Sequence, residues 1–307
     1  MARQKGCRIC KKEAFIHLRY ANLPLCKEHF VSRTESVVQE AINKFRMFSR
    51  KDKLLVAVSG GKDSLALWHI IAKLGYNADG IHIDLGLGEF SRLSSKISRD
   101  FAEKHGLYLH MLSINEELGA SIHSLVKKRY EKPCSFCGAV KRYILNKASY
   151  ELGYDVLITG HNLDDESARL LGNVLNWDEE YIYHQYPVLP KEGKMVKKVK
   201  PLVFISRKEL ASYCEAEGIE HIKIACPYAT GARSLVLTDI MEQIESRYPA
   251  TKLRFVKGFY KLRDRFMPPE KVILYECPDC GMPTSSERLC RFCRIKNGVK
   301  HDTAQTD

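Results

Sequence analysis

The eleven cysteines of this 307-residue chain constrain its fold more than any other feature of the sequence. Eight of them form four Cys-x-x-Cys pairs. The chain starts Met-Ala-Arg-Gln-Lys-Gly-Cys, with no apolar segment behind the positive charges, so a secretory signal and a disulfide framework are both disfavoured. Paired cysteines in a reducing compartment usually hold metal. We therefore expect a cytoplasmic protein that contains metal.

The two ends of the chain resemble each other, because each carries four soft or borderline metal ligands on two short knuckles. Four such ligands suit tetrahedral zinc with no open position, which is typical of a structural site. Segments 1–32 and 267–307 are too short to bury a core, so we expect zinc to supply their folding free energy. Accidental clustering of cysteines is the alternative. The predicted zinc ligands are Cys7, Cys10, Cys26 and His29 at one end, and Cys277, Cys280, Cys290 and Cys293 at the other.

Strands and helices alternate along the middle of the chain, residues 33–266. This alternation predicts an α/β domain with a parallel sheet, covered by helices, that binds ligands at the carboxyl ends of its strands. A Ser32-x-x-Glu35 capping box predicts the start of a connecting helix, and 187–201 predicts a polar loop or hairpin. The predicted strands are 54–58, 78–84, 107–114 and 155–159, and the predicted helices 64–74, 91–105, 138–152 and 164–176.

A glycine-rich loop follows the first predicted strand. Glycines let the backbone approach a phosphate closely, and the N-terminus of the next helix supplies aimed N–H donors. Its lysine adds a cation and its serines add hydroxyl donors. The loop lacks the spacing of a Walker A motif. It consists of Ser59, Gly60, Gly61, Lys62, Asp63 and Ser64.

Two further strands end in polar residues at the same predicted edge. The second strand ends at Asp84, and the fourth is followed by Gly160-His-Asn-Leu-Asp164-Asp165. A carboxylate pair there suits Mg²⁺, although Asp also caps helices and the two uses can coexist. Together these segments resemble the PP-loop ATPases. That resemblance implies that ATP binds at this edge and adenylates a substrate oxygen, with the adenosine held near Asp84.

Three more cysteines lie within the middle domain. Cys134 and Cys137 form a central pair, and Cys226 precedes a proline, a recurrent setting for iron–sulfur ligands. Zinc with a fourth ligand from elsewhere and a redox-active Cys134–Cys137 disulfide are the alternatives. The last cysteine, Cys214, lies in a predicted helix and reads as a small core residue.

The PP-loop, the central cysteines, the Gly-His-Asn-x-Asp-Asp string and the zinc knuckles at both ends resemble the TtcA/TtuA superfamily of tRNA thiolases. The terminal knuckles favour the TtuA-type subgroup. The resemblance implies that Cys134, Cys137 and Cys226 bind a [4Fe–4S] cluster, and that ATP activates O2 of a tRNA uridine for replacement by sulfur. It further implies the T-loop 5-methyluridine as substrate and a thiocarboxylated ubiquitin-like protein as sulfur donor. Wobble-uridine thiolases share the same plan.

Three residues match positions at which this family carries functional side chains. Asp63 and Asp165 are expected to handle Mg²⁺ or phosphate, and Lys141 to stabilise charge near the uracil. A solvated helix cation is the alternative for Lys141. A homodimer is a further expectation.

The formal net charge of +12 favours a polyanionic partner. A basic stretch with interleaved aromatic residues suits an RNA surface, although a basic amphipathic helix with its rings in the core explains the rings equally well. Its predicted RNA contacts are Lys252, Arg254, Lys257, Lys261, Arg263 and Arg265.

Composition and motifs narrow the remaining functions. Hydrophobic residues at 45% and charged residues at 28% exclude wholesale disorder, and no apolar run approaches the ~18 residues of a transmembrane helix. An amide- or amidine-forming PP-loop ligase is the alternative enzyme, but an amine nucleophile needs no central cysteines. A zinc-ribbon RNA-binding protein is the alternative outside enzymes, and the intact nucleotide loop argues against it.

Overall fold

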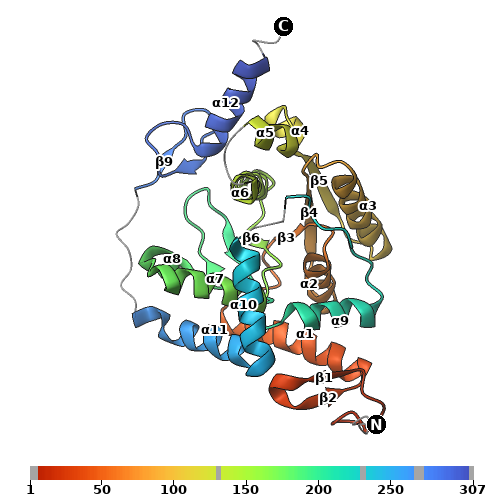
Figure 1. Ribbon diagram of the computed structural model, residues 1–307. Coiled ribbons are helices and arrows are strands. Elements are labelled where there is room, and N and C mark those ends of the chain that lie inside the picture. Colours follow the sequence, from red (N-terminus) through yellow and green to blue (C-terminus); the bar gives the residue numbers. More distant parts are fainter. Residues whose placement is uncertain (1–5, 129–132, 229–232, 266–272, 304–307) are drawn as a thin grey trace.

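The computed structural model describes residues 6–128, 133–228, 233–265 and 273–303. Helices and strands alternate through the middle of the chain as predicted, with a small β-hairpin near each end (Figure 1). The strands are β1 Ile16–Leu18, β2 Leu23–Leu25, β3 Leu54–Val58, β4 Ala78–Asp84, β5 Leu109–Ser113, β6 Val156–Ile158, β7 Val188–Leu189, β8 Lys197–Val199, β9 Tyr275–Glu276 and β10 Pro283–Thr284. The helices are α1 Lys27–Lys44, α2 Lys62–Lys73, α3 Glu89–Lys104, α4 Ile114–Leu118, α5 Ile122–Lys128, α6 Pro133–Glu151, α7 Leu163–Asn176, α8 Glu179–His184, α9 Arg207–Glu217, α10 Arg233–Arg247, α11 Thr251–Leu262 and α12 Arg291–Thr303, with 3-10 turns η1 Arg19–Ala21 and η2 Arg263–Arg265.

The central sheet has six strands in the order β5-β4-β3-β6-β8-β7. Its first five strands run parallel, because a helical crossover separates most of them in sequence, and β7 pairs antiparallel with β8 as an edge hairpin. The parallel α/β sheet and the hairpin in 187–201 are therefore confirmed. Because β3 and β6 are neighbours, the loops that follow them lie side by side at one edge of the sheet.

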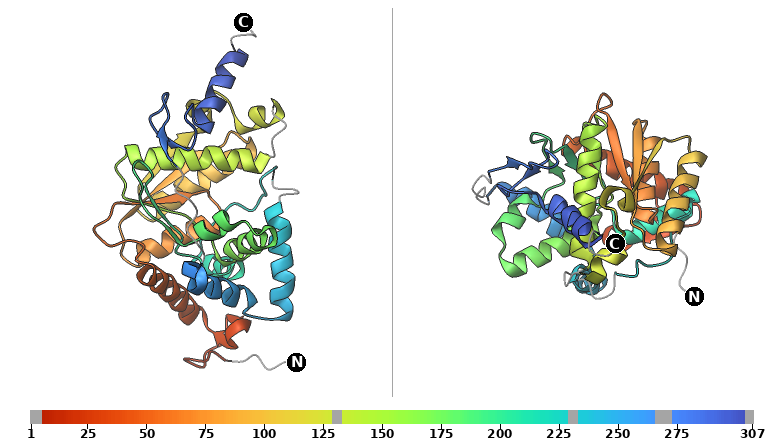
Figure 2. Two further views of the ribbon diagram at one scale, coloured as in Figure 1. Left: turned by 90° about the vertical axis from the view of Figure 1, so that its left-hand side faces the viewer. Right: turned by 90° about the horizontal axis from the view of Figure 1, so that it is seen from above.

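Helices cover both faces of the sheet. Figure 1 places α6 above the sheet and α1, α2, α9 and α11 below it, and the left view of Figure 2 shows α6 crossing the upper face. Below the sheet, one large core is built around Trp68 and Tyr213, which are 0% exposed. Above it, Leu55 and Leu157 of the sheet pack against Leu145 of α6. Burial of these apolar faces holds the layers together.

Helix α1 corrects the predicted start of the connecting helix. The helix begins at Lys27, with Cys26 in the extended conformation of an N-cap, and Ser32 lies inside it. The predicted capping box at Ser32 is therefore wrong. The early start places His29 on the first turn, next to the N-terminal cysteines, so one helix connects the zinc knuckle to the main core.

Helix α6 also begins earlier than predicted. It starts at Pro133, which suits a first helical position, so Cys134 and Cys137 lie on its first turns. A spacing of three residues places their side chains on neighbouring positions of one helix face. Among the described helices, none is both long and apolar enough to cross a membrane.

Candidate active site

The glycine-rich loop between β3 and α2 has a folded, preorganised shape. Gly60 has φ of +71°, and a Cβ there would lie 2.7 Å from the carbonyl oxygen of Ser94, so only glycine fits. The Ser59 N–H donates to Ser64 Oγ at 3.1 Å, and Ser64 Oγ donates to the Gly61 carbonyl at 3.0 Å. Gly61 is the N-cap of α2 and has no side chain to occupy the helix end. The first N–H groups of α2 are therefore available to an anion.

Gly160 brings the second predicted segment against this loop. A Cβ at Gly160 would lie 3.2 Å from the Ser64 nitrogen and 3.3 Å from the Asp63 carbonyl carbon. The backbones after β3 and β6 therefore touch. This contact brings the carboxylates of 63 and 165 to one place, as the strand alternation predicted.

Four charged side chains of alternating sign gather at this edge. Lys62 Nζ lies 2.8 Å from Asp63 Oδ1, and Arg207 Nη2 donates to Asp165 Oδ1 at 2.5 Å. Burial raises the pKa of Asp63, the Lys62 ammonium lowers it, and the negative charge of Asp165 raises it again. Asp63 and Asp165 therefore act on each other electrostatically. Two half-buried carboxylates on adjoining loops are a suitable donor set for Mg²⁺.

Arg207 was missed by the sequence analysis. It is the first residue of α9, which a Ser206/Glu209 capping box opens. That capping box was a readable sign of the helix start. Its position beside Asp165 depends on a contact 42 residues apart in sequence, which no local pattern reveals.

The two aspartates after β6 have different roles. Asn162 caps α7, and Asp165 completes the capping box by accepting from the Asn162 N–H at 3.2 Å. Asp164 is 5% exposed and points into the protein, where it accepts from Lys252 Nζ at 2.6 Å and from the Arg207 N–H at 2.8 Å. Asp165 thus caps α7 and also lies at the predicted nucleotide site, whereas Asp164 links α7 to the neighbouring helices α9 and α11.

Asp84 closes the turn after β4. Its Oδ1 accepts from the Gly86 N–H at 2.8 Å, at the same sheet edge as the glycine-rich loop. Behind it, His82 is 2% exposed and contacts Ser95 and Ser98 of α3, with Nε2 to Ser95 Oγ at 3.1 Å. The small serines let α3 approach the loop closely. Asp84 therefore lies at the same sheet edge as the loop, and the binding of adenosine beside it stays a prediction.

The central cysteines come together from α6 and the segment before α10. Cys134 is exposed and donates to the Tyr228 carbonyl at 3.2 Å. Burial raises the pKa of Cys137, the charge of Lys141 lowers it, and the thiols of Cys226 and Cys134 raise it again. In each terminal ligand set, all ligand atoms lie within 4.8 Å of one another. The three central thiols, all in the described residues, are not packed as closely, and at least two of their sulfur atoms lie more than 4.8 Å apart. Lys141, Cys134 and Cys226 nevertheless lie near enough to Cys137 to act on it electrostatically.

Both terminal ligand sets have the geometry of tetrahedral zinc. In each set the ligand atoms lie within 4.8 Å of one another. Cys10 Sγ lies 3.6 Å from Cys26 Sγ, and Cys280 Sγ lies 3.8 Å from Cys290 Sγ. Zn–S bonds of about 2.3 Å at tetrahedral angles require sulfur atoms roughly 3.8 Å apart. The sequence analysis therefore grouped residues that the fold does bring together.

Backbone N–H groups support thiolate at both sets. Burial raises the pKa of Cys7, but backbone N–H bonds from Cys10 and Cys26 outweigh it and lower the pKa to about 6. Cys277 follows the same pattern: burial raises its pKa, and N–H bonds from Cys290 and Cys280 lower it to about 6. Zinc binds the thiolate form, so the surroundings of Cys7 and Cys277 favour the metal. The pKa values of Cys10 and Cys290 are raised instead, so a bound metal would have to stabilise their thiolates.

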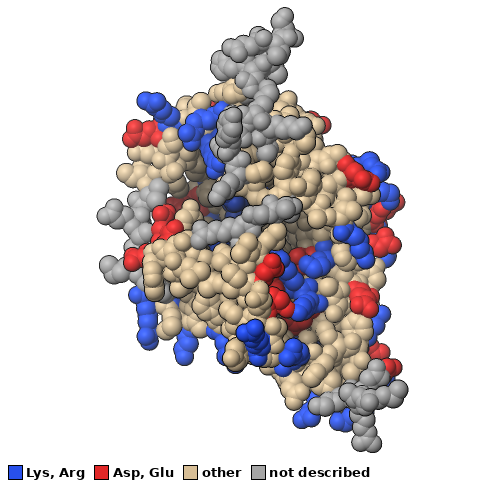
Figure 3. Space-filling model, viewed as in Figure 1, with Lys and Arg blue, Asp and Glu red and all other residues tan. Residues whose placement is uncertain are grey.

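The basic stretch on α11 is only partly a surface. Lys252 is 2% exposed and forms ion pairs with Asp164 and with Glu242, each at 2.6 Å, so the prediction that it contacts RNA is wrong. Arg263 lies half-buried against the rings of Tyr183 and Tyr186. Phe259 and Tyr260 are buried in the core, which supports the amphipathic-helix explanation of the rings. The exposed cations of the stretch are Arg254, Lys257, Lys261 and Arg265. Figure 3 shows Lys and Arg side chains at the lower left of the molecule, over α11.

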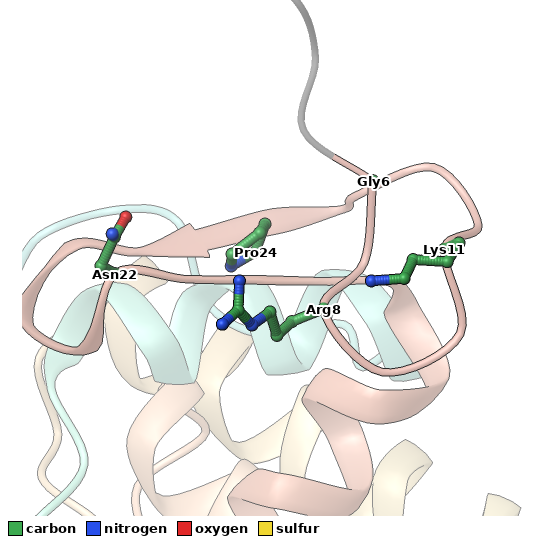
Figure 4. Close-up of a pocket in the computed structure, with 5 residues that line it drawn as sticks. All are labelled: Gly6, Arg8, Lys11, Asn22 and Pro24. Carbon is green, nitrogen blue, oxygen red and sulfur yellow. The ribbon is translucent and has the colours of Figure 1, made fainter.

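Two hollows lie outside the nucleotide loop. One of about 290 Å³ is at the N-terminal knuckle, where Figure 4 shows Arg8 and Lys11 beside Pro24. The other, about 250 Å³, lies between α6 and the C-terminal ribbon. Neither contains a residue of the 59–64 loop, so the chemistry of this site rests on the loops and not on these hollows.

Comparison with known families agrees with the fold and the loop. The phosphoadenosine phosphosulfate reductase domain family matches residues 53–235, which contain β3, the glycine-rich loop and all three central cysteines. The fold and the loop thus define an enzyme of the PP-loop class. The N-terminal LIM domain of the 2-thiouridine synthetase TtuA matches residues 7–31, the segment that contains the first predicted zinc set.

Full-length relatives define the family. The tRNA-5-methyluridine(54) 2-sulfurtransferase of Pyrococcus horikoshii is 40% identical over 98% of this chain and 97% of its own. The enzyme of the same name from Thermotoga maritima is 43% identical over 96% and 97%. A solved structure of the U34-tRNA thiolase NcsA from Methanococcus maripaludis, with its [4Fe–4S] cluster, is 26% identical over 96% of both chains, with a TM-score of 0.82. The chain belongs to the TtuA-type tRNA 2-sulfurtransferases, and the predicted family is confirmed.

Proposed function

We propose that this enzyme uses ATP to replace O2 of the T-loop 5-methyluridine of tRNA with sulfur. The single observation that carries the substrate is the 40–43% identity, over nearly the whole chain, with relatives named for that nucleoside. The intact loop and the carboxylates of Asp63 and Asp165 support the ATP-dependent step.

In the proposed adenylation, loop 59–64 binds the departing pyrophosphate. The backbone N–H groups at the start of α2 and the Lys62 ammonium stabilise its negative charge, and the glycines permit close approach. The uracil O2 attacks the α-phosphorus of ATP, and pyrophosphate leaves. Asp63 and Asp165 would hold Mg²⁺, which neutralises phosphate charge when bound.

Substitution by sulfur needs the activated oxygen, because a uracil carbonyl is a poor electrophile. After adenylation, sulfur bonds to C2 and the former O2 leaves as part of AMP. The Lys141 ammonium, whose charge acts on Cys137, would stabilise negative charge that develops at this step. We propose the thiocarboxylated tail of a ubiquitin-like protein as the sulfur source. Water cleaves its acyl C–S bond, so the tail leaves as a carboxylate and the sulfur is transferred at the sulfide oxidation level.

Cys134, Cys137 and Cys226 would hold a [4Fe–4S] cluster. The donor set fits, because three free thiols that act on one another electrostatically lie near one cation and supply the soft ligands that iron–sulfur clusters require. When bound through only three thiolates, the cluster would supply one iron with an open coordination position. The two terminal sets would hold structural zinc.

Iron loading can be tested without the tRNA reaction. After anaerobic reconstitution, alanine at any of the three cysteines should abolish the visible cluster absorbance and cut the iron content. Ser135→Ala, on the same exposed turn of α6, should leave both unchanged. Normal iron content in all three cysteine variants would exclude these ligands.

The exposed cations of α11 are proposed as one part of the tRNA surface. Lys257 and Lys261 remain exposed on this helix, so their charges are available to phosphates. Replacing both by Gln should weaken tRNA binding and flatten its salt dependence, while ATP binding is kept. An unchanged tRNA affinity would remove α11 from the footprint.

Wobble-uridine thiolation is the second candidate, since the solved structure of the U34-tRNA thiolase is similar to this chain over 96% of its length. An amide-forming ligase explains none of the central cysteines. A cytoplasmic location and a homodimer remain predictions.

Nucleoside analysis of tRNA from a strain lacking this protein separates the two substrates. We expect loss of 5-methyl-2-thiouridine and its return when the wild-type gene, but not an Asp165→Asn variant, is restored. Loss of a wobble 2-thiouridine derivative instead would move the enzyme to the second candidate. Unchanged tRNA would overturn the proposed function.

A further inference from the structure

Four cations lie close enough on the upper side of the sheet to act on one another. The pKa of Arg142 on α6 is lowered, mainly by partial burial and in addition by the positive charges of Arg169 and Arg291. The pKa of Lys198 is lowered by burial and then by Arg142. The α6 cation cluster, as we call it, consists of Arg142, Arg169, Lys198 and Arg291.

The sheet register explains the position of Lys198. It lies opposite Leu157 on the neighbouring strand, and Leu157 packs against Leu145 and Ala148 of α6. Side chains opposite each other in a sheet share a face, so Lys198 lies on the α6 face. Its neighbour Lys197 reaches the Arg46 carbonyl instead, as expected from strand alternation.

A ring stack accounts for the arginines of α6 and α12. Tyr143 and Phe292 stack with ring centroids 3.9 Å apart and an interplanar angle of 12°. Their chain neighbours Arg142 and Arg291 are thereby brought to the same junction between helix and ribbon, beside the 250 Å³ hollow that Arg291 lines. Arg142 itself extends over Gly138, where an added Cβ would lie 3.1 Å from its guanidinium.

The cluster adjoins the proposed active site. Arg169 follows Asp165 by four residues on α7, one helical turn and about 6 Å away. Arg142 directly follows Lys141. A chain held at the cluster therefore lies within reach of the carboxylate edge and of the central cysteines.

A bound anion would offset the mutual repulsion of Arg142, Arg169 and Lys198. The side chains of Arg142, Arg169 and Lys198 have no hydrogen bond or ion pair with another residue in the described ranges. Like charges held together at reduced solvation destabilise the fold, and guanidinium groups match phosphate oxygens in bidentate geometry. Tyr181, 55% exposed, lies near enough to act on Arg142, and Trp177 is 74% exposed on the adjoining turn.

We propose that the α6 cation cluster binds the phosphodiester backbone of the tRNA next to the target nucleoside. Several cations on separate elements suit the successive phosphates of a polynucleotide better than a ligand with a single carboxylate. Exposed aromatic rings beside these cations suit unstacked bases. This proposal rests on the proposed function, since it names where that substrate is held.

The test compares the double variant Arg142→Gln/Arg169→Gln with Arg92→Gln/Lys96→Gln, which removes two exposed cations from α3. Titrations of full-length protein with tRNA over a salt series should show at least tenfold weaker binding for the cluster variant. The slope of log K against log salt should fall by about 2. The α3 variant should lose much less.

Two further measurements separate the explanations. Because the substitutions remove mutual repulsion, the melting temperature of the cluster variant should equal or exceed that of wild type at low salt, whereas a structural role would lower it. ATP affinity should be unchanged. Equal losses in both double variants, unchanged tRNA affinity, or loss of affinity only for a thiocarboxylated carrier protein would overturn the proposal. If wild-type protein binds tRNA through the cluster but restores no thionucleoside, only the proposed function fails.

Discussion

Arg207 Nη2 donates to Asp165 Oδ1 at 2.5 Å and joins the first turn of α9 to the first turn of α7. Burial lowers the pKa of Arg207, while the charges of Asp165, Asp164 and Asp63 raise it, so the net shift is upward. One guanidinium thus offsets the carboxylates on which the proposed nucleotide site depends. Without that cation, ATP would approach a more negative site.

Replacing Arg207 by Gln should raise the KM for ATP about tenfold, which corresponds to about 1.4 kcal/mol. The pair is about one-third exposed, so the free energy of unfolding should change by at most about 1 kcal/mol. Pyrophosphate exchange at varied ATP checks the first value and urea denaturation the second. The control is Lys208→Gln, which removes the adjacent, more exposed cation paired with Glu242. An equal KM effect in both variants would contradict a specific role.

The pH dependence of MgATP binding should report the electrostatic contact between Asp63 and Asp165. Burial and the charge of Asp165 raise the pKa of Asp63, so its protonated form persists to higher pH and binding is lost as the pH falls through a value above that of an ordinary aspartate. Asp165→Asn should shift this midpoint downward. Lys62→Gln should shift it upward, because the Lys62 ammonium lowers the pKa. Calorimetric titrations over roughly pH 4 to 7 measure both, and shifts in the same direction would refute the assignment.

The raised pKa of Asp63 also has a consequence for stability. A carboxyl group that holds its proton more tightly in the fold contributes stability that is present below its unfolded pKa and lost as the pH rises through its folded pKa. Ionising Asp63 therefore costs the fold free energy, which is typical of functional positions.

Lys252 should behave as a structural residue and Lys261 as a surface residue. Lys252→Ala leaves the Asp164 carboxylate buried without its cation and should lower the free energy of unfolding by about 3–5 kcal/mol. Lys261→Ala, at an exposed position on the same helix, should change it by at most about 0.5 kcal/mol. Denaturant titrations measure both. A small loss in Lys252→Ala would mean that water or another cation replaces the ammonium.

The contrast between these lysines marks the limit of sequence reasoning. The β-α alternation predicted a parallel sheet with its polar loops at one edge, because the carboxyl ends of parallel strands lie together, and the strand order agrees with this. Cysteine spacing grouped the ligands of both zinc sets, which are short-range patterns. Lys252 and Lys261 look alike in sequence, and only a partner 88 residues away decides that Lys252 is buried.

The α6 cation cluster was missed for a related reason. Arg142, Arg169 and Lys198 come from three separate elements and form no basic run, so charge patterning along the chain cannot detect them. Helix α1 shows the opposite failure: a valid capping pattern at Ser32 lost to an earlier start that places His29 beside the zinc cysteines. Tertiary contacts and metal ligation overrode local signals at these places.

Removing the Tyr143 hydroxyl should weaken zinc binding at the C-terminal ribbon. Burial raises the pKa of Tyr143, and so does its closeness to Cys280, one of the four predicted ligands. Because groups that hold a metal ligand from outside typically contribute about 10- to 100-fold in affinity, Tyr143→Phe should lose that much while the ring stack on Phe292 is kept. Competition with a zinc chelator measures the affinity. Tyr150→Phe, at an exposed position of the same helix, is the control, and equal zinc affinity in the two variants would show that the hydroxyl does not support the metal.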